Sequence, residues 1–533
     1  MDTRAAIRAA VKNIATHGDT DVFPFPFELH LFHDRPDECV ALLERIHADF
    51  DEVMSTNAPD VIETLAQVGY TGFRWAAQIE PFWNAYYLAC VIQLASEIES
   101  TRLPEEDESV YSYRFLWQED TGKLFKDSTW RDYKTRCIAL SSSHPYVVVT
   151  DIADFYPRIY HHRVDVALSR LPSSGDIRRR IMKMLSVFSR IHVSYGLPVG
   201  GPASRILSEL ALAGVDQHLR ATHRVFCRYA DDYCIFCADQ SSAYKSLVFL
   251  SERLFDEGLV LQKKKTRILT SEEYRETSRA FLPPDEATDN TEERKLLNIS
   301  LRFDPYSPTA EEDYEALKAA IGDVDIVGIL GREVAKAAID PTISKQAVNA
   351  IRALDPALQG GAIRTVLDPK NLTVLSPVFV TILRLVRAVY SSLPEHDQDF
   401  VDDVLMGLYN TGSPLLSIDL NLSYCIQVLG QRKSEAKEEL LVNLFESNQK
   451  PLIRRLIVLV LADWKSHYWL SAAKRRYSGF SLWEKRAFIL GSYVLGDEGN
   501  HWRRHARNSW TPMEELIRDW FSDRYPGNNR MPL

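Results

Sequence analysis

The stretch RYADDYCIF, residues 228–236, places two adjacent carboxylates, Asp231 and Asp232, between two short runs of strand-forming residues. Neighbouring carboxylates repel each other, and each raises the pKa of the other unless a positive charge lies between them. A bound divalent cation is the usual source of that charge. The stretch therefore predicts a strand, a tight turn and a second strand that present ligands to a metal ion.

A third carboxylate ends an earlier strand. The run Val147–Thr150 is β-branched, as in a buried strand, and it stops at Asp151. If the two segments pair in one sheet, Asp151, Asp231 and Asp232 form one cluster. Nucleotidyl transfer needs two divalent ions about 4 Å apart, one at the attacking hydroxyl and one at the triphosphate, and carboxylates suit Mg²⁺ or Mn²⁺. Because Asp also favours turns for local reasons, the cluster needs support from other motifs.

That support comes from four segments that resemble, in order, the motifs of the reverse transcriptase palm. The resemblance extends over roughly 100–270, and the segments are VVVTDIADFYPRI (147–159), YGLPVGGPASRILSEL (195–210), YADD (229–232) and EGLVLQKKKTRI (257–268). It implies an enzyme, an RNA-directed DNA polymerase or DNA nucleotidyltransferase.

The resemblance also implies an α+β fold with the right-hand fingers and palm of a polymerase, the palm being a ferredoxin-like antiparallel sheet with helices. We expect a mainly helical N-terminal and fingers region at 1–145 and the palm at 146–282. The stretch 283–309 is rich in Pro, Asp, Glu and Thr and is interpreted as a linker. Beyond it, helical patterns broken by Gly or Pro predict an all-α, solenoid-like helical-repeat domain at 310–533.

The resemblance assigns roles around the metal ions. Asp151 and Asp231 would be ligands with Asp232 beside them, and the main-chain carbonyl of Ile152 would complete one shell. Tyr156, five positions after the first aspartate, resembles the aromatic gate whose ring leaves no room for a 2′-hydroxyl and so selects deoxynucleotides.

Other residues would hold the substrate. Gly200 and the glycine after it would let the backbone approach the nascent pair or template, since a side chain would obstruct it. Lys265 would lie near the leaving pyrophosphate. Arg114, in the segment YSYRF, resembles the fingers residue that clamps a triphosphate, a bidentate task suited to guanidinium. Arg131 and Lys134 compete with it for that role.

The sequence departs from the family pattern at three places. Family members commonly carry Gln where this chain has Val199, and a Ser-Pro step where it has Ser204 and Arg205. Valine cannot hydrogen-bond the incoming sugar or the template, so the resemblance does not extend to strict template use. A primer-grip turn is not clear either, and RAFLP at 279–283 is a faint counterpart.

No RNase H, integrase, protease or endonuclease signature accompanies these motifs. The helical second half resembles that of bacterial abortive-infection and defence-associated reverse transcriptases, which implies DNA synthesis from dNTPs that protects the host against phage. Some members of that group prime from a protein hydroxyl without a template, others copy a noncoding RNA, and several form homo-oligomers through the helical part. The alternatives stay open here, and with them the partners: dNTPs, a DNA product, a noncoding RNA and a second copy of the chain.

A tyrosine hydroxyl can replace a 3′-hydroxyl in protein priming. The candidates in the helical region are Tyr390, Tyr409, Tyr424, Tyr468, Tyr477, Tyr493 and Tyr525. A different function is also open, because a ferredoxin-like sheet and a helical solenoid occur in nucleotide-sensing scaffolds that do not polymerise. Substitution of both turn aspartates distinguishes the two classes.

The bulk composition, with 45% hydrophobic and 26% charged residues among 533 and a net charge of −10, predicts a globular protein of several domains rather than a polycation. Basic runs at 177–183, 263–267 and 503–507 are the only local candidates for nucleic-acid surfaces. Seven cysteines do not suggest a disulfide framework, and Cys234 and Cys237 are interpreted as reduced core residues on opposite faces of a strand. The longest apolar run, at 456–462, is too short for a membrane span, so we expect a soluble cytoplasmic protein.

Overall fold

The computed structural model describes residues 1–127, 130–188, 194–278, 292–299, 318–319, 321–322, 324–336 and 338–533. The chain divides into two compact units. The first contains Met1–Glu63, Trp75–Ala287 and Thr511–Trp520, and the second contains Thr64–Arg74, Thr288–Trp510 and Phe521–Leu533. The finer boundaries expected from the sequence remain predictions.

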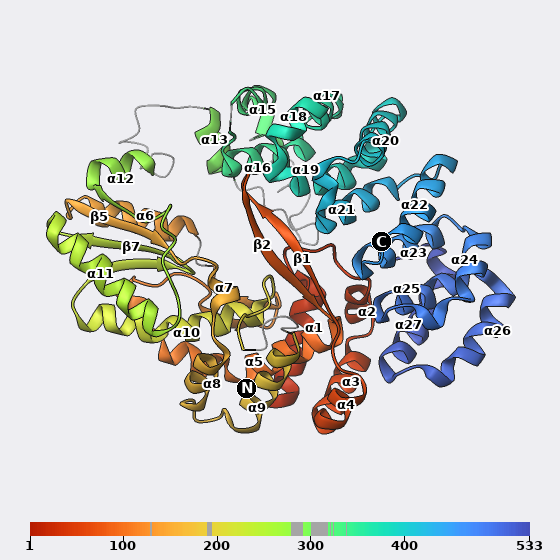
Figure 1. The fold of residues 1–533 in the computed structure, drawn as a ribbon, viewed down its shortest axis with the longest axis horizontal. Helices are drawn as coiled ribbons and strands as arrows, with labels where there is room; N and C mark the ends of the chain where they lie inside the picture. The colour runs from red at the N-terminus through yellow and green to blue at the C-terminus, as the bar shows by residue number, and fades with distance from the viewer. Residues whose placement is uncertain are drawn as a thin grey trace. The chain divides into compact units, whose positions relative to one another are not determined.

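A four-stranded antiparallel sheet in the first unit carries the aspartates (Figure 1). Its strand order is β6 (Val225–Tyr229), β7 (Asp232–Cys237), β5 (Tyr146–Asp151) and β8 (Arg267–Thr270). The predicted hairpin at 223–239 and the predicted strand ending at Asp151 are confirmed. The predicted lysine-bearing edge strand is shorter than expected, because only 267–270 pairs regularly with β5.

Two long helices lie on one face of this sheet, α10 (Pro202–Ala221) and α11 (Gln240–Asp256). Tyr233 on β7 donates its hydroxyl hydrogen to Asp216 Oδ1 of α10 at 3.1 Å. Cys237, four positions further along β7, contacts the hydroxyl of Ser246 on α11. Odd-numbered side chains of β7 therefore point toward these helices, as the two-residue period of a strand requires.

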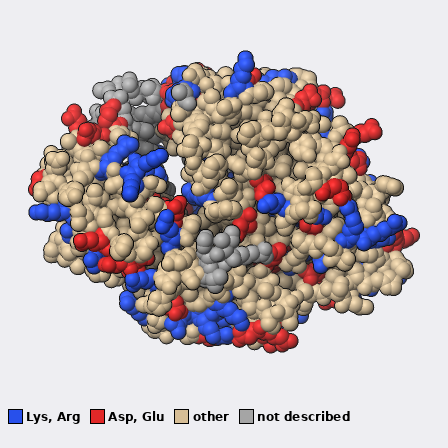
Figure 2. Space-filling view, viewed as in Figure 1, with Lys and Arg blue, Asp and Glu red and all other residues tan. Residues whose placement is uncertain are grey.

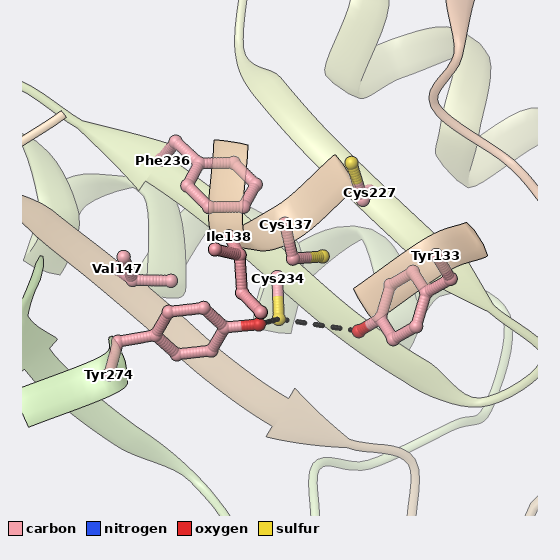
Figure 3. Packing of buried hydrophobic residues seen from close by; sticks show 8 residues of the cluster. All are labelled: Tyr133, Cys137, Ile138, Val147, Cys227, Cys234, Phe236 and Tyr274. Carbon is pink, nitrogen blue, oxygen red and sulfur yellow. Dashed lines mark hydrogen bonds between the residues drawn. The ribbon is translucent and has the colours of Figure 1, made fainter. Parts of the chain in front are cut away.

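The opposite face, which carries Asp232, is covered by α6 (Trp130–Ser141) and α12 (Ser271–Thr277). Figure 3 shows the buried cluster there, in which Tyr133 of α6 and Tyr274 of α12 both reach the Cys234 thiol. The tyrosine hydroxyl of α6 donates to that sulfur at 3.2 Å. All seven cysteines are buried and free, and Cys237 points away from this cluster, which confirms their interpretation as reduced core residues.

The rest of the first unit is mostly helical. Its other helices are α1 (Thr3–His17), α2 (Glu28–Asp34), α3 (Pro36–Ala48), α4 (Phe50–Thr56), α5 (Pro81–Thr101), α7 (Phe155–Arg158), α8 (His161–Ser169) and α9 (Gly175–Phe188). The hairpin expected at 111–125 forms as β3 (Phe115–Gln118) and β4 (Lys123–Phe125).

The first hundred residues are mainly helical, as expected, with one exception at 61–79. This segment forms a hairpin of β1 (Val61–Val68) and β2 (Gly72–Ile79), whose tip, 64–74, groups with the second unit. Gly69, at φ 77°, makes the turn. Burial alternates along β1, as in a strand with one face buried. This packing outweighs the helix propensity of several residues in VIETLAQV.

Apart from the hairpin tip at 64–74, the described part of the second unit is all-helical, which confirms the expectation of a helical C-terminal region (Figure 1). Its helices are α13 (Glu292–Asn298), α15 (Ile326–Val334), α16 (Pro341–Ala350), α17 (Pro356–Leu367), α18 (Pro369–Val374), α19 (Phe379–Val389), α20 (Glu395–Asn410), α21 (Asp419–Leu429), α22 (Glu435–Ser447), α23 (Pro451–Asp463), α24 (His467–Lys474), α25 (Leu482–Gly491), α26 (Gly496–Ala506) and α27 (Pro512–Asn528), the last of which begins in the first unit.

Local sequence explains several of these helix starts. Helices α16, α17 and α18 each begin with a proline that follows an aspartate, and the side chain of that aspartate (Asp340, Asp355 or Asp368) accepts a main-chain N–H of the first turn. Aspartate at the N-cap and proline at the first helical position satisfy donors that have no partner inside the helix. An Asp-Pro step is therefore a helix start here.

Alternate helices pack on one another in the order α19, α21, α23 and α25. The solenoid-like repeat remains a prediction. Helix α13 lies inside the stretch interpreted as a linker, and the linker itself remains a prediction. The rest of that stretch, 283–291 and 300–309, lies outside the described residues, and so does the primer-grip counterpart at 279–283. No helix within the described ranges is long and apolar enough to span a bilayer.

Candidate active site

The pairing of β5 with β7 brings the predicted carboxylates together. In this antiparallel register Asp151 lies directly opposite Asp232, at the end of both strands. The main-chain N–H of Ile152 donates to the carbonyl of Asp231 at 3.2 Å, which ties the turn to the same strand end. Residues 80 or so positions apart in sequence therefore form one acidic cluster, because opposed residues of antiparallel strands lie about 5 Å apart.

The turn between β6 and β7 has a strained backbone. Ala230 has φ 52°, in the left-handed region that residues with a Cβ seldom adopt. The guanidinium of Arg228, buried below the sheet, donates to the carbonyl of Ala230 at 2.9 Å and holds the turn in this conformation. The strain sets the direction of Asp231, the residue that follows.

Burial and mutual repulsion disfavour the charged forms of the two turn aspartates. Burial, with the charges of Asp151 and Asp232, raises the pKa of Asp231 to about 7. Burial and the charge of Asp151 raise the pKa of Asp232 to about 6, although the nearby lysine charges of Lys265 and Lys134 lower it. The cluster thus holds more negative charge at neutral pH than its surroundings neutralise.

One lysine partly compensates this charge. The ammonium of Lys265 forms an ion pair with Asp151 Oδ2. Burial alone would lower the pKa of Lys265, but the hydrogen bond and charge of Asp151, with the other two aspartates, outweigh burial and raise it. The segment that carries this lysine is fixed to β5 by the N–H of Gln262, which donates to the carbonyl of Asp151 at 2.7 Å.

The donor set fits a divalent cation. Asp151 is 6% exposed, and its Oδ1 has no hydrogen-bond donor among the described residues while Asp231 is ionised. An unpartnered buried carboxylate oxygen beside two carboxyls of raised pKa gains strongly from a hard cation. Among the residues that the structure describes, no three potential ligands already converge in metal-site geometry, so Asp231 and Asp232 would have to adjust their side chains on binding.

Tyr156 lies at the start of α7, just after β5, and is half-buried. Burial raises its pKa well above the usual range, while a hydrogen bond from Ser208 and the charge of Arg205 act in the opposite direction. Its hydroxyl is therefore turned toward α10, and the phenol stays protonated.

Gly200 requires glycine for a structural reason, and its predicted role beside the nascent pair or template remains a prediction. Its φ is 125°, and a Cβ built on it would lie 2.3 Å from Thr20 Oγ1. The backbone of Gly200 is thus packed closely against the side chain of Thr20, which belongs to the same unit. The next glycine, Gly201, has ordinary room, since its Cβ would meet Asp19 O at 3.5 Å.

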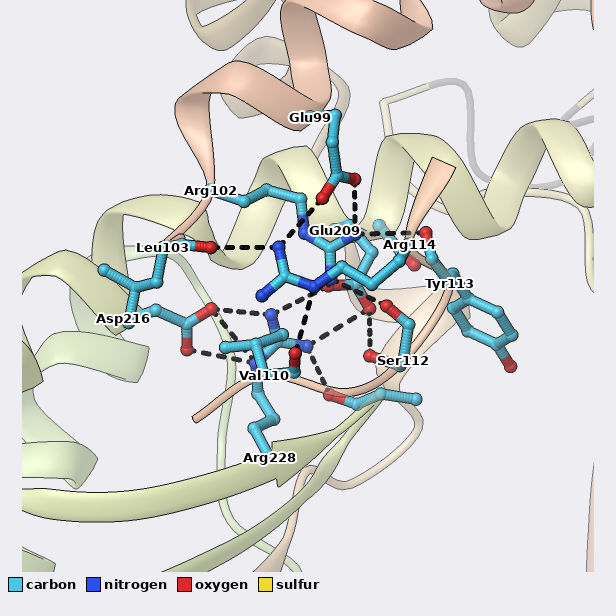
Figure 4. A network of polar contacts seen from close by, with 12 residues as sticks. Glu99, Arg102, Leu103, Val110, Ser112, Tyr113, Arg114, Glu209, Asp216 and Arg228 are labelled. Carbon is cyan, nitrogen blue, oxygen red and sulfur yellow. Dashed lines mark hydrogen bonds and ion pairs between the residues drawn. The ribbon is translucent and has the colours of Figure 1, made fainter. Parts of the chain in front are cut away.

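Arg114 is not placed to clamp a triphosphate, which corrects the expectation for this residue. It is 3% exposed. Its Nη1 donates to Glu99 Oε1 at 2.8 Å and to the carbonyl of Leu103 at 2.9 Å, and its Nε donates to the carbonyl of Val110 at 3.0 Å. Figure 4 shows its guanidinium within a network of charged side chains.

That network continues through two further arginines. Arg102 and Arg228 both pair with Glu209 of α10, at 2.7 and 2.8 Å, and Arg228 also pairs with Asp216 at 2.6 Å (Figure 4). All four side chains are at most 2% exposed. Removal of one member of such a buried set leaves an uncompensated charge, so its members act as structural ties between α5, α10 and β6.

A basic cavity of about 280 Å³ adjoins the aspartates. Asp151 and Asp232 line it on one side, and four cations line it as well: Lys134, Lys264, Lys265 and Arg267. Figure 2 shows Lys and Arg gathered on the left of the molecule, where Figure 1 places α6 and α12. Lys264 and Arg267 were not expected as site residues, although the basic run at 263–267 was a signal for them.

Lys134, one of the two alternatives to Arg114, is held by aromatic rings. Its ammonium lies 4.9 Å from the centroid of Trp130, 5.4 Å from that of Tyr133 and 5.9 Å from that of Tyr274. Cation–π contacts of this kind position a lysine without neutralising its charge. The ammonium remains available to a phosphate in the cavity.

Comparison with known proteins agrees with this site. The family model "Reverse transcriptase (RNA-dependent DNA polymerase)" matches residues 102–299. No curated protein matches the chain. Two solved structures are similar over much of their length: apo telomerase from Candida tropicalis (10% identity, 79% of this chain and 72% of that one, TM-score 0.29) and telomerase from Candida albicans with a TWJ fragment of telomeric RNA (12%, 80% and 67%, 0.31).

TM-scores below 0.5 do not establish a common fold, so the assignment depends on the family match and on the four ordered motifs. The matched residues contain β5 to β8, the aspartate cluster and the basic cavity. The chain therefore contains a reverse transcriptase domain, and its enzyme class is that of an RNA-directed DNA polymerase, a nucleotidyltransferase.

Proposed function

We propose that this protein polymerises dNTPs into DNA at the cluster of Asp151, Asp231 and Asp232, with two divalent ions, Mg²⁺ or Mn²⁺. The observation that carries the proposal is the β5–β7 register, which sets Asp151 opposite Asp232. The unpartnered Oδ1 of Asp151 and the raised pKa values of the turn aspartates support it, because all three features favour binding of a cation.

When bound, the ions would activate the attacking hydroxyl and stabilise the negative charge of the transferring phosphoryl group. The chain's own residues have separate tasks. Lys265 keeps its proton beside Asp151 and can donate it to the pyrophosphate oxygen as that group leaves. Lys134, Lys264 and Arg267 line the cavity next to the aspartates and can bind the phosphates of the incoming nucleotide in place of Arg114.

Sugar selection is assigned to Tyr156. Its ring lies one short turn after β5, and its hydroxyl is tied toward Ser208 of α10. A fixed ring at this place would exclude a 2′-hydroxyl on steric grounds. The carbonyl of Ile152 is proposed as a further oxygen ligand, since its own N–H is already fixed to Asp231.

We further propose that the activity serves anti-phage defence in the cytoplasm, as in the abortive-infection enzymes that the helical half resembles, and that copies of the chain associate through that half. Protein priming is the favoured mode. Among the candidate tyrosines Tyr468 is 92% exposed, whereas Tyr390 and Tyr424 are 2% and 3% exposed. The hydroxyl of Tyr390 is moreover occupied by Asp402 Oδ2 at 2.9 Å. Tyr468 on α24 is the candidate with the most accessible hydroxyl.

The experiment is incubation of the purified full chain with Mg²⁺ and labelled dNTPs, with neither template nor primer, followed by denaturing gels before and after protease and DNase. Label that stays with the protein, is removed by DNase and is lost in Asp231→Asn/Asp232→Asn supports protein-primed synthesis. Tyr468→Phe should abolish it, while Tyr244→Phe serves as the control, because Tyr244 is an exposed tyrosine outside the set of candidates.

Other outcomes select the alternatives. Synthesis only after RNA is added would indicate templated cDNA synthesis on a partner noncoding RNA. No incorporation in either condition, with phage protection that survives Asp231→Asn/Asp232→Asn, would overturn the polymerase proposal in favour of a nucleotide-sensing scaffold.

A further inference from the structure

The helical unit contains a second cavity with a cationic lining. Its volume is about 480 Å³, larger than the cavity beside the aspartates. Three arginines and one carboxylate contribute to its wall: Arg384, Arg387, Arg530 and Asp463. Gln431 and Met531 are among the other residues that line it. The reverse transcriptase match covers residues 102–299, so the residues that line this cavity lie outside the matched domain.

Arg387 is the most enclosed of the three arginines. Its guanidinium donates to Gln427 Oε1 at 2.9 Å and to the main-chain oxygen of Leu533 at 2.6 Å. Within the described residues, no aspartate or glutamate side chain forms an ion pair with it. Burial lowers its pKa, and the only opposing influence is the phenol of Tyr424. Arg387 is half-buried, and these two hydrogen bonds use only part of its five N–H donors, so a bound anion could accept further hydrogen bonds from it.

Further cations lie close to Arg384, one of the arginines that line the cavity. Arg384 lies with its guanidinium 5.0 Å from the ring centroid of Tyr424 and donates to the phenol oxygen from Nε at 3.0 Å. Burial, with the like charges of Arg74 and Arg384, lowers the pKa of Lys345. Positive side chains from the 64–74 tip, α16, α19 and the C-terminal segment therefore share one field.

The carboxylate in the wall has a structural partner. Asp463 Oδ1 accepts the main-chain N–H of Met531 at 2.9 Å, which holds the segment carrying Arg530 against the cavity. Its charge offsets only part of the arginine charge. The remaining guanidinium donors suit planar, multidentate contact with phosphate oxygens.

We propose that this cavity binds the phosphate groups of a nucleotide, taken either from a free nucleoside triphosphate or from a nucleic-acid strand. Arg387 would bind at the base of the cavity, and Arg384 and Arg530 would close on the phosphate from its rim. Because these residues lie outside the matched domain, the role that we assign to the site is the sensing of nucleotide or product, and this role rests on the proposed polymerase function.

The test measures binding to the full chain in EDTA, so that nucleotide cannot bind at the aspartates through a metal ion. The probes are a fluorescently labelled oligothymidylate, followed by anisotropy, and unlabelled dATP as competitor. The variants are Arg384→Gln/Arg387→Gln and Arg530→Gln, with Arg475→Gln as control, because Arg475 is an exposed arginine of the same unit outside the cavity. We expect the double variant to weaken binding about tenfold or more and Arg530→Gln about threefold, with the control unchanged.

The two sources give different results. Displacement of the labelled oligonucleotide by dATP indicates a site for a free nucleotide. If dATP does not displace the oligonucleotide, and log K depends less steeply on log salt in the variants than in the unmodified protein, the site binds a strand. Equal binding by all variants, or an equal loss in Arg475→Gln, overturns the proposal. If the double variant does not fold, as judged by its melting curve, Arg530→Gln decides, since the side chain of Arg530 is exposed at the rim.

Discussion

The ammonium of Lys265 forms an ion pair with Asp151, the carboxylate that lies opposite Asp232 in the sheet. The pair joins the last of the four motifs to the first, across the edge of the sheet. It uses only Oδ2, so that Oδ1 of the same carboxylate stays buried and unpartnered among the described residues. The lysine therefore competes with a divalent cation for the charge of Asp151 while leaving one oxygen open to it.

Lys265→Gln should change catalysis and metal affinity in opposite directions. Without the ammonium, release of pyrophosphate lacks a proton donor, and we expect incorporation to fall about 100-fold. The charge of Asp151 is then uncompensated, so the Mg²⁺ concentration for half-maximal rate should decrease. The measurement is dNTP incorporation across a Mg²⁺ titration. Lys263→Gln, an exposed lysine of the same run, is the control, and a parallel loss of rate and metal affinity in Lys265→Gln would indicate a merely structural role.

Asp231→Asn should stabilise the metal-free protein, and more so at pH 8 than at pH 5. The folded-state pKa of Asp231 is about 7, above the unfolded value, so folding is disfavoured increasingly as pH rises from about 4 and fully above 7. The amide removes that cost. Melting temperatures in EDTA at the two pH values check this, with Asp403→Asn as an exposed control.

Added Mg²⁺ should reverse the order of stability. It binds the ionised carboxylates of the unmodified protein, so it should raise the melting temperature at pH 8, raise it less at pH 5, and leave Asp231→Asn nearly unchanged. A metal shift that is as large at pH 5 as at pH 8 would contradict the assignment of Asp231 as a ligand.

The aspartate cluster could be predicted because its signals are local: β-branched strands, a two-aspartate turn and their order. The hydrophobic residues of both strands must be buried in one sheet, and this requirement pairs β5 with β7. The role of Arg114 could not be predicted in this way, because its partner Glu99 and the linked Glu209 are brought to it by packing of α5 against α10. The sequence around an arginine in a short polar segment does not distinguish an arginine that binds a substrate from one that pairs with a buried carboxylate.

Arg114→Gln and Lys134→Gln should therefore have different effects. Loss of the buried guanidinium leaves the main-chain carbonyls of Leu103 and Val110 without this donor. It also removes one of the two arginine partners of Glu99, which Arg102 still contacts, and should cost roughly 3 kcal/mol of stability. Loss of the Lys134 ammonium should raise the KM for dNTPs severalfold and change the melting temperature little. Thermal melts and steady-state kinetics on both variants check this, and a raised KM with an unchanged melt in Arg114→Gln would restore it as the triphosphate clamp.

The two adjacent glycines of the second motif give a matched pair. Gly200→Ala should destabilise the domain, since its φ costs about 1–2 kcal/mol for a residue with a Cβ and Thr20 Oγ1 collides with the added methyl. Thr20→Ala should relieve the collision but not the backbone strain, so the double variant should recover only in part. Gly201→Ala should be tolerated. Equal loss from both alanines would show that space at the motif, rather than the conformation at Gly200, is limiting.

Tyr156 offers the sharpest test of sugar selection, because its two properties can be separated. Tyr156→Phe keeps the ring and removes the hydroxyl that bonds Ser208, so it should still prefer dNTPs even if it loses some stability. Tyr156→Ala removes the ring and should raise incorporation of ribonucleotides relative to deoxynucleotides about tenfold or more, because steric exclusion of the 2′-hydroxyl disappears. The measurement is the ratio of kcat/KM for rNTP and dNTP in each variant. An unchanged ratio in Tyr156→Ala would mean that the phenol serves only to tie α7 to α10 and that another residue reads the sugar.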